Sequence, residues 1–248
     1  MGLYHDKTPK QRGATGLLRF LWYNEVMGLI SLLFAQPVLF VIVALILVVA
    51  ITVHEFAHAW AADHLGDPTP RYQGRVTLNP LAHLDLLGTA LLFFAGFGWG
   101  KPVMFDPHNL KDPVKEAALI ALAGPVSNLL LALLLAIVIP VLTVFLHIPM
   151  EWAQVILSFG IFYNCMLAIF NLVPVHPLDG GKILVALLPR RMAYEYESMM
   201  SRYGTFILIA LILPLSGGRS PVSFLITPII DVVVSVYLSL TQFIVSLL

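Results

Sequence analysis

The sequence predicts an all-α polytopic membrane protein with four to six transmembrane helices. Of its 248 residues, 59% are hydrophobic and only 11% are charged, and the mean hydropathy is +0.89. Soluble domains carry about 25% charged and about 45–50% apolar residues. Several apolar runs also match a bilayer, because a helix needs about 20 apolar residues to cross a hydrocarbon core about 30 Å thick. The formal net charge of zero gives no reason to expect a nucleic-acid partner.

The chain is expected to divide into a polar and interfacial segment, 1–36, and a single membrane-embedded domain, 37–248. The start of the chain is polar, and no apolar core with a cleavage site follows it, so a removable signal peptide is not expected. Residues 16–35 carry an arginine, an asparagine and a glutamate within an apolar run. This composition favours a helix in the membrane interface over a span. The single cysteine, Cys165, excludes an internal disulfide.

Apolar segments of spanning length follow one another along the domain. The first runs from Pro37 to Ala62. Its proline suits the first helical turn, because the missing N–H costs nothing there. Further apolar runs are found at 116–147, 151–174 and 221–247, with a shorter one near 203–215. Because no linker, no low-complexity run and no stretch long enough for a folded soluble domain separates these runs, they are expected to form one domain.

The apolar segment 86–100, LLGTALLFFAGFGWG, is too short for an ordinary span. As a helix it would cover about 22 Å of the roughly 30 Å core. It ends in glycines, and the adjoining Lys101 and Pro102 are typical of an edge strand. We therefore expect a re-entrant or β-loop segment near 86–105 that enters and leaves the membrane on one side. A short tilted span is the alternative.

Ionisable residues occur at the end of the first apolar run, in ITVHEFAHAW. His54 and His58 are four residues apart, so they lie on one face of a helix, and Glu55 directly follows the first histidine. This is the H-E-x-x-H pattern, in which two imidazoles bind zinc and the glutamate is the general base. Each ionisable group inside a span costs about 2.5–3.5 kcal/mol on insertion scales. Three such groups at ligand spacing therefore predict a zinc site better than they predict helix packing.

A catalytic zinc site usually has a third protein ligand. His64 is excluded, because on a continuing helix it lies about 9 Å further along the axis than His58. Asp179, in NLVPVHPLDGG, follows the 151–174 span, and the adjacent proline and glycines are expected to break the helix and hold the aspartate in a turn. His176 is expected to be a turn residue, although a competing ligand or a residue that supports a ligand are alternatives.

The two motifs together resemble the site-2 proteases, the intramembrane zinc metalloproteases of peptidase family M50. The matching residues are His54-Glu55-Phe56-Ala57-His58 and Asn171-x-x-Pro174-x-x-x-x-Asp179-Gly180. Between them, GFGWGKPV and AGPVSN resemble the compact bacterial members that lack PDZ and CBS domains. The resemblance implies one Zn²⁺ per chain, held by His54, His58 and Asp179. It also implies that Glu55 is the catalytic base and that Asn171 helps to position the substrate.

The resemblance further implies a substrate and a location. The substrate would be a membrane protein that is cleaved in or near a transmembrane segment, in regulated intramembrane proteolysis, after its helix unwinds to a strand. That strand would bind residues of the glycine-rich segment, namely Gly96, Gly98, Trp99 and Gly100. The protein would be an integral multi-pass protein of the bacterial inner membrane. Its active site would face the cytoplasm, because nine of the 14 lysines and arginines fall on that side in the re-entrant topology.

A metal-binding membrane protein without proteolytic activity, such as a transporter, is the alternative from another class. The intact Glu55 argues against an inactive relative, and a transporter usually shows internal repeats that are not evident in this sequence. Three other polar residues allow more than one interpretation. His83 could order the turn before 86–100, Asn128 of AGPVSN could hydrogen-bond across helices, and Asp231 lies inside the last apolar run.

Overall fold

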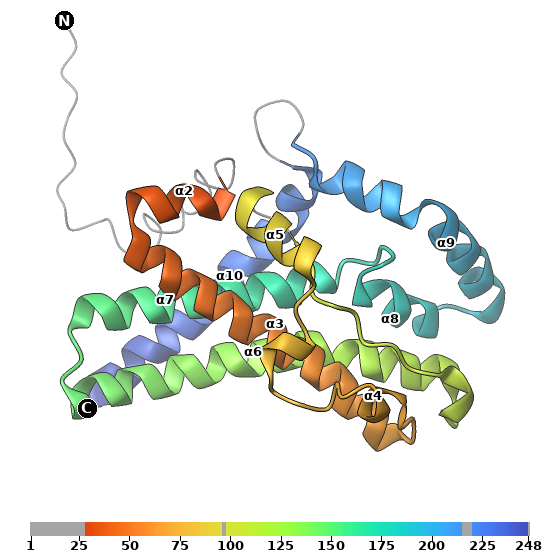
Figure 1. The fold of residues 1–248 in the computed structure, drawn as a ribbon, viewed down its shortest axis with the longest axis horizontal. Helices are drawn as coiled ribbons and strands as arrows, with labels where there is room; N and C mark the ends of the chain where they lie inside the picture. The colour runs from red at the N-terminus through yellow and green to blue at the C-terminus, as the bar shows by residue number, and fades with distance from the viewer. Residues whose placement is uncertain (1–27, 96–97, 215–219, 248) are drawn as a thin grey trace, which may run out of the picture.

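A computed structural model describes residues 28–95, 98–214 and 220–247 (Figure 1). In these ranges, four helices are long and apolar enough to cross a membrane: α3 (Pro37–Leu65), α6 (Pro113–Leu146), α7 (Met150–Asn171) and α10 (Pro221–Leu247). The predicted all-α polytopic class is thereby confirmed, and the described spans lie at the lower end of the expected four to six.

Shorter elements connect these spans. They are α2 (Gly28–Ala35) before α3; α4 (Thr69–Tyr72), η3 (Pro80–Ala82), α5 (Leu86–Ala95) and η4 (Pro107–Asn109) before α6; and α8 (Asp179–Leu187) and α9 (Arg190–Ile212) before α10. The apolar run expected near 203–215 belongs largely to the second half of α9. Because the first half of α9 is polar, this helix is not one of the candidate spans.

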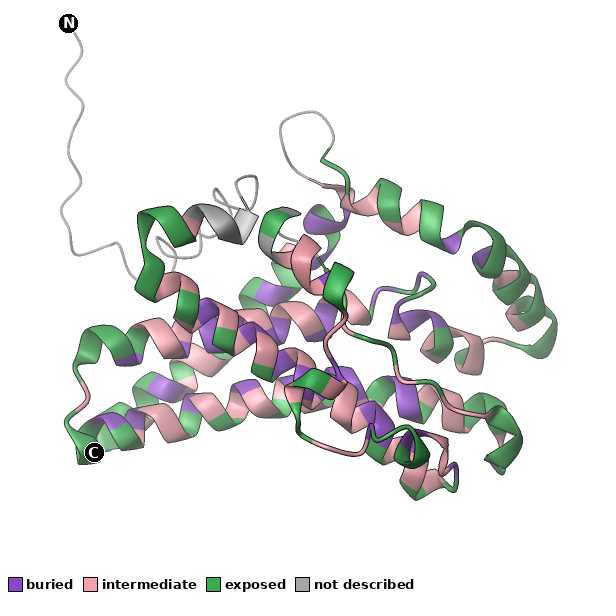
Figure 2. Cartoon of the chain, viewed as in Figure 1, coloured by how far each residue is buried: buried purple, intermediate pink, exposed green. Residues whose placement is uncertain are grey.

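The four candidate spans form one bundle in which α3 and α7 run in one direction and α6 and α10 run in the other (Figure 1). Helix α6 lies at the centre, in contact with α3, α7 and α10. Its buried residues include Gly124, Ala132 and Ala136, small residues that let helices in membranes approach closely. Figure 2 shows that buried residues line the facing sides of α3, α6 and α7, whereas the outer sides are exposed. Leu45 and Leu130 are among the large apolar side chains exposed on these outer sides, where a bilayer would cover them.

The described parts of 86–105, namely 86–95 and 98–105, leave and rejoin the bundle on one side, as predicted. From residue 98 to residue 106 the chain is non-helical, and Gly100 forms an isolated antiparallel bridge with Leu84. At the base of this excursion, the buried Asp67 accepts hydrogen bonds from Asn109 Nδ2 and from the Asp106 N–H, both at 2.7 Å. The residues before and after the segment therefore lie at the same end of the bundle, which excludes a tilted span. The predicted β-loop is limited to this single bridge among the described residues.

The hydrogen bonds of Asp67 also fix its charge. Burial alone would raise the pKa of this carboxyl, but hydrogen bonds from Thr69, Asn109 and the Asp106 N–H outweigh burial and lower the pKa below its ordinary value. Asp67 therefore remains an ionised acceptor at neutral pH. It links the end of α3 to the non-helical segment that precedes α6.

Cysteine labelling can check this topology in a membrane. Single cysteines at positions 68 and 108, on a Cys165→Ser background, should react with an impermeant maleimide from the same side, because both positions flank the contacts of Asp67. The Cys165→Ser background removes the single native cysteine, which is fully buried. A control cysteine at Pro149, in the turn between α6 and α7, should react only from the opposite side. Labelling of 68 and 108 from opposite sides would contradict the re-entrant arrangement.

Candidate metal centre

Three side chains from two distant parts of the chain, α3 and the first residue of α8, converge on one point. Asp179 Oδ2 lies 3.3 Å from His54 Nε2 and 3.3 Å from His58 Nε2. Among the residues that the structure describes, this is the single group of three His, Cys, Asp or Glu side chains whose ligand atoms lie within 4.8 Å of one another. The structure therefore brings together the three residues that were expected to hold a metal ion.

The nitrogen that faces away from Asp179 is held by a hydrogen bond in each histidine. His58 Nδ1 lies 2.7 Å from the Ile120 carbonyl oxygen, and His54 Nδ1 lies 2.6 Å from Asn128 Oδ1. A carbonyl oxygen only accepts, so His58 Nδ1 carries the hydrogen of this bond. The lone pair of the neutral imidazole is then on Nε2, on the side of Asp179.

Asn128 imposes the same tautomer on His54. Its Nδ2 donates to the Ala50 carbonyl at 3.0 Å and to Asn164 Oδ1 at 2.9 Å, which identifies the amide nitrogen. Its Oδ1 therefore accepts from His54 Nδ1, and the Nε2 lone pair points to Asp179. The predicted hydrogen bond across helices is confirmed. The contact of Asn128 with a ligand histidine was not predicted, and it corresponds to the outer contacts that orient metal-binding imidazoles.

The resulting cluster fits a metal ion. Two imidazole lone pairs face the buried Asp179 Oδ2, which accepts no hydrogen bond from the described residues. Acceptors that converge without a proton between them repel one another unless a cation lies among them. The observed spacing of 3.3 Å equals the separation, about 3.3 Å, of two atoms that each lie about 2.0–2.1 Å from one tetrahedral zinc. Two nitrogens and one oxygen also match a catalytic zinc site, which keeps one position open.

Helix α6 approaches the two imidazoles through Gly124. A Cβ atom at this position would lie 2.4 Å from His58 Nε2 and 2.7 Å from His54 Cε1. Any side chain here would therefore occupy the space of the metal ligands. The small residues of AGPVSN predicted close helix packing, and the structure shows that this packing brings α6 against the metal centre.

Asp179 reaches the cluster because α7 ends at Asn171 and α8 begins at Asp179. The expectation that Asp179 sits in a glycine turn is wrong. Gly180 belongs to the first turn of α8, and a Cβ there would lie 2.3 Å from the Leu172 carbonyl oxygen. The glycine thus allows α8 to fold back against the end of α7, and this tertiary contact outweighs the low helix propensity of glycine.

The two other histidines considered as ligands lie outside the three-residue cluster. His176 is exposed in the turn between α7 and α8, which agrees with its prediction as a turn residue. His64 is exposed near the end of α3, and its Nδ1 lies 2.9 Å from the carbonyl oxygen of Trp60. Its exclusion from the ligand set agrees with this position.

Glu55 faces two other parts of the chain. Its Oε2 lies 3.8 Å from Arg75 Nη2, and a Cβ at Gly100 would lie 3.2 Å from its Oε1. Arg75 also donates to the Lys101 carbonyl oxygen. Burial lowers the pKa of Arg75, and the Glu55 carboxylate opposes this effect. Sequence reasoning missed Arg75, although an arginine in GRVTLNP is notable in a chain with only 11% charged residues.

The candidate substrate-binding residues have different environments. Gly98 and Trp99 both lie against α5, where a Cβ at Gly98 would be 2.1 Å from the Gly88 carbonyl oxygen. Asn171 donates to the Leu167 carbonyl oxygen of its own helix at 2.9 Å. Gly96 lies outside the described residues. The structure thus places part of the glycine-rich segment next to Glu55, but substrate contact by any of these residues remains a prediction.

Two further polar residues can now be located. The fully buried His83 lies with its Nε2 2.7 Å from the Thr77 carbonyl oxygen, and its own carbonyl accepts from the Lys101 N–H at 2.7 Å. It therefore orders the turn before α5, as one interpretation expected. Burial lowers the pKa of His83 and favours the neutral ring. Asp231 is exposed on α10.

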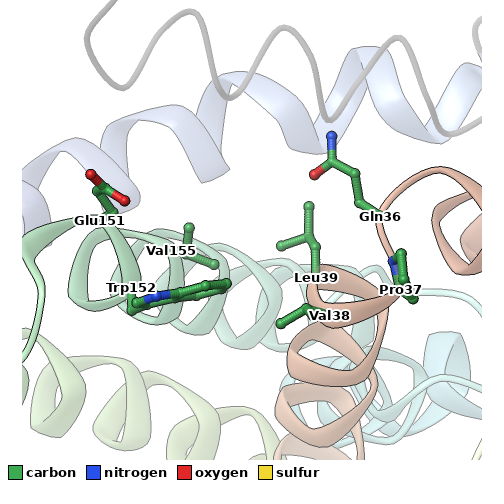
Figure 3. Close-up of a pocket in the computed structure, with 7 residues that line it drawn as sticks. All are labelled: Gln36, Pro37, Val38, Leu39, Glu151, Trp152 and Val155. Carbon is green, nitrogen blue, oxygen red and sulfur yellow. The ribbon is translucent and has the colours of Figure 1, made fainter.

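A separate cavity of about 330 Å³ lies at the other end of α3 (Figure 3). It is lined by Gln36, Pro37, Val38, Leu39, Glu151, Trp152 and Val155. Residue 39 precedes His54 on α3 by a distance of about 22 Å along the helix axis. The cavity is therefore distinct from the metal centre.

Comparisons with known proteins agree with the motifs and the geometry. A family model described as Peptidase family M50 matches residues 42–153 and 140–211, which is more than half of the chain. YwhC from Bacillus subtilis, a candidate zinc metalloprotease, is 37% identical over 169 residues, or 66% of this chain and 77% of YwhC. Rip2 from Mycobacterium tuberculosis, another candidate zinc metalloprotease, is 32% identical over 168 residues, or 66% of this chain and 62% of Rip2. Stage IV sporulation protein FB from Bacillus subtilis is 27% identical over 159 residues, or 60% of this chain and 51% of that protein. No solved structure matches.

Proposed function

Because the chain belongs to peptidase family M50 and is a zinc metalloprotease of the membrane, we propose that it is an intramembrane endopeptidase. Its substrates would be other membrane proteins, cut in or next to a transmembrane segment. The proposal rests on the position of the three-residue cluster among helices that are long and apolar enough to span a membrane. His54 and His58 lie on α3, a helix apolar enough to span the bilayer. Asp179 meets them from the first turn of α8, one turn of the chain beyond α7, which is another such helix.

The three cluster residues and two neighbouring side chains, Asn128 and Glu55, would have different roles in hydrolysis. When bound, Zn²⁺ supplies Lewis-acid catalysis, because it polarises a carbonyl group and makes water more acidic. His54, His58 and Asp179 would hold the ion, and Asn128 would keep the His54 tautomer that offers Nε2. Glu55 would take a proton from the attacking water and return it to the leaving amine.

The substrate must unwind before its peptide bond can react, because a helix hides its carbonyl groups in its own hydrogen bonds. An unwound strand in a membrane leaves N–H and C=O groups unpaired, each at a cost of several kcal/mol. Binding to a free strand edge would satisfy them. Asn171, at the end of α7, would assist in positioning this strand.

Gly100 supplies such an edge beside Glu55. The Lys101 N–H pairs with the His83 carbonyl, and Leu84 and Gly100 face each other in the antiparallel bridge. In this pattern the N–H and C=O groups of the bridged pair point away from each other. The backbone groups of Gly100 therefore point away from Leu84, and a substrate strand could pair with them next to the proposed base.

Backbone N-methylation of a substrate can check this strand binding. We expect a quenched fluorogenic peptide with a Leu/Ala transmembrane segment and a central glycine pair to lose cleavage when single amides near the cut site are methylated. Sensitivity should alternate, with losses of about 10-fold or more at every second residue, because strand pairing uses the amides of alternate residues and a missing partner costs about 1–3 kcal/mol. Methylation of the residues between them is the matched control. Uniform sensitivity, or none, would argue against an added strand.

The active-site end of the bundle is proposed to face the cytoplasm of a bacterial cell, in the inner membrane. Basic residues at this end support that orientation under the positive-inside rule, including Lys101, Lys111 and Lys115. The maleimide experiment described above, performed on intact cells, also decides the orientation. Labelling of position 108 in intact cells by the impermeant reagent would contradict a cytoplasmic site.

The proposed function is tested by the position of the cut. Purified protein loaded with one equivalent of zinc should cleave the quenched transmembrane peptide, and mass spectrometry should place the cut within or directly beside the apolar segment. A chelator should stop cleavage and zinc should restore it. Cleavage confined to distant soluble flanks would contradict intramembrane proteolysis. Zinc binding without cleavage of this peptide or of unfolded casein would instead favour a metal-binding protein without proteolytic activity.

A further inference from the structure

Arg75 is a buried cation beside the proposed base. Its side chain is 3% exposed, although arginine is almost never fully buried unless it is paired. Its backbone is fixed by a hydrogen bond from its N–H to the Pro70 carbonyl at 2.8 Å, directly after Gly74 with φ of +66°. The chain therefore directs a guanidinium into the interior from an ordered turn rather than leaving it at the surface.

The guanidinium of Arg75 contacts two groups that belong to different parts of the site. Its Nη2 lies 3.8 Å from Glu55 Oε2 on α3, and it donates to the Lys101 carbonyl oxygen in the returning segment. Its Nε has no hydrogen-bond partner among the described residues. A planar guanidinium presents several donors in a fixed fork, so it can hold two acceptors at a set distance from each other.

The segment that Arg75 holds is the one proposed to bind the substrate. Both backbone groups of Lys101 are used, because its N–H donates to His83 and its carbonyl accepts from Arg75. Among the described residues, the N–H and C=O groups of the preceding Gly100 have no backbone hydrogen-bond partner, and Gly100 lies against Glu55. A shift of this segment would therefore move the substrate relative to the proton acceptor.

We propose that Arg75 is a positioning residue, which fixes the distance and orientation of the Glu55 carboxylate relative to the strand edge at Gly100. This inference rests on the proposed function, in which Glu55 is the base and Gly100 pairs with the substrate. Arg75 acts through Glu55 and through the Lys101 carbonyl, and it is not one of the metal ligands. Its loss should therefore slow the chemical step while zinc and substrate still bind.

Two substitutions separate charge from geometry. Arg75→Gln removes the cation, and Arg75→Lys keeps it but replaces the fork by a single ammonium group. With the quenched transmembrane peptide, Arg75→Gln is expected to lower kcat by about 10- to 100-fold, the effect of misplacing a reacting group, with KM changed by less than about twofold. Arg75→Lys should recover part of kcat. Both variants should retain one zinc per chain, measured by mass spectrometry of the metal.

Arg71→Gln is the matched control. Arg71 pairs with Asp63, which lies on α3 as Glu55 does. The Arg71 side chain is 67% exposed, and its described contacts do not include Glu55 or Lys101. The control should match wild type in kcat, KM and zinc content. A similar fall in kcat in Arg71→Gln would show that the fall in Arg75→Gln reflects the loss of any positive charge in this region, and not the contacts of Arg75.

A double-mutant cycle with Glu55→Asp tests whether Arg75 acts through the base. The shorter carboxylate should retain slow cleavage but lose its relation to Arg75, so Arg75→Gln should cost much less in this background than in wild type. Equal costs in the two backgrounds would overturn the proposal. So would wild-type kcat in Arg75→Gln, a rise in KM alone, or loss of zinc and of folded protein in both Arg75 variants.

The proposed function can fail separately from this inference. If wild type does not cleave the peptide, or if Glu55→Gln cleaves at the wild-type rate, the assigned reaction or base is wrong whatever Arg75 does. If wild type cleaves and Glu55→Gln does not, the results for Arg75 bear on positioning alone.

Discussion

Asp179→Ala is expected to lose both zinc and hydrolytic activity, whereas His176→Ala keeps both. Asp179 Oδ2 lies 3.3 Å from each histidine Nε2, and His176 lies outside this cluster in an exposed turn. Loss of a group that only orients a ligand already lowers metal affinity about 10- to 100-fold, so loss of the ligand itself should lower it further. Zinc per chain in the purified variants, with peptide cleavage measured in parallel, provides the comparison.

Asp231→Ala is the control for this experiment, because it removes an exposed aspartate of α10 that lies outside the cluster. It should keep one zinc per chain. Release of zinc from His176→Ala, with zinc retained in Asp179→Ala, would reverse the assignment of the third ligand. Asp179→Asn, which is close in size to the native residue, distinguishes loss of a ligand from damage to the first turn of α8.

Glu55→Gln is expected to lower kcat by about 10²- to 10⁴-fold, which is the contribution of a general acid–base group. Zinc should remain bound, because the three atoms that converge on the metal position come from His54, His58 and Asp179. Glutamine preserves the size of the side chain next to Gly100 and removes its ability to take a proton. Single-turnover cleavage of the quenched transmembrane peptide, together with zinc analysis, checks both expectations.

The two possible failures of this prediction have different meanings. Loss of zinc from Glu55→Gln would show that Glu55 is a ligand rather than a base. Unchanged cleavage with zinc bound would show that another group accepts the proton. Asp85→Asn is the comparison variant, because it also replaces a carboxylate by an amide. Asp85 Oδ1 accepts from the Gly88 N–H at 2.7 Å at the start of α5.

Local spacing and length were sufficient to predict much of this structure. His54 and His58 had to share a face of a helix because they are four residues apart, and 86–100 had to turn back because it is too short to span. Spacing within one helix could not predict that these histidines meet Asp179. That prediction came from the second motif and the family resemblance.

The contacts that the sequence did not reveal are made between distant segments. Arg75 meets Glu55 and Lys101 because the turn that carries it is anchored near the end of α3, and a single sequence contains no signal for that pairing. Asn128 was recognised as a residue that bonds across helices, but its partner His54 is 74 positions away. Long-range pairing of this kind depends on how the helices pack rather than on local propensity.

The start of α8 shows the opposite case, in which a local signal was misleading. Gly180 and Gly181 suggested a turn, because glycine disfavours helix by about 1 kcal/mol. In the structure both glycines are buried in the first turn of α8, where a side chain would meet the end of α7 or the turn that follows it. Close approach of two segments therefore explains these glycines better than backbone flexibility does.

X-ray absorption spectroscopy of the zinc-loaded wild-type protein tests the central claim most directly, because it reports the atoms bound to the metal. We expect two imidazole nitrogens and one carboxylate oxygen from the protein, at about 2.0–2.2 Å, with one further light atom at the open position. The Asp179→Ala variant, loaded with excess zinc, should lose the carboxylate contribution or fail to bind zinc. A wild-type spectrum with three imidazoles, or with fewer than two, would contradict a centre built from His54, His58 and Asp179.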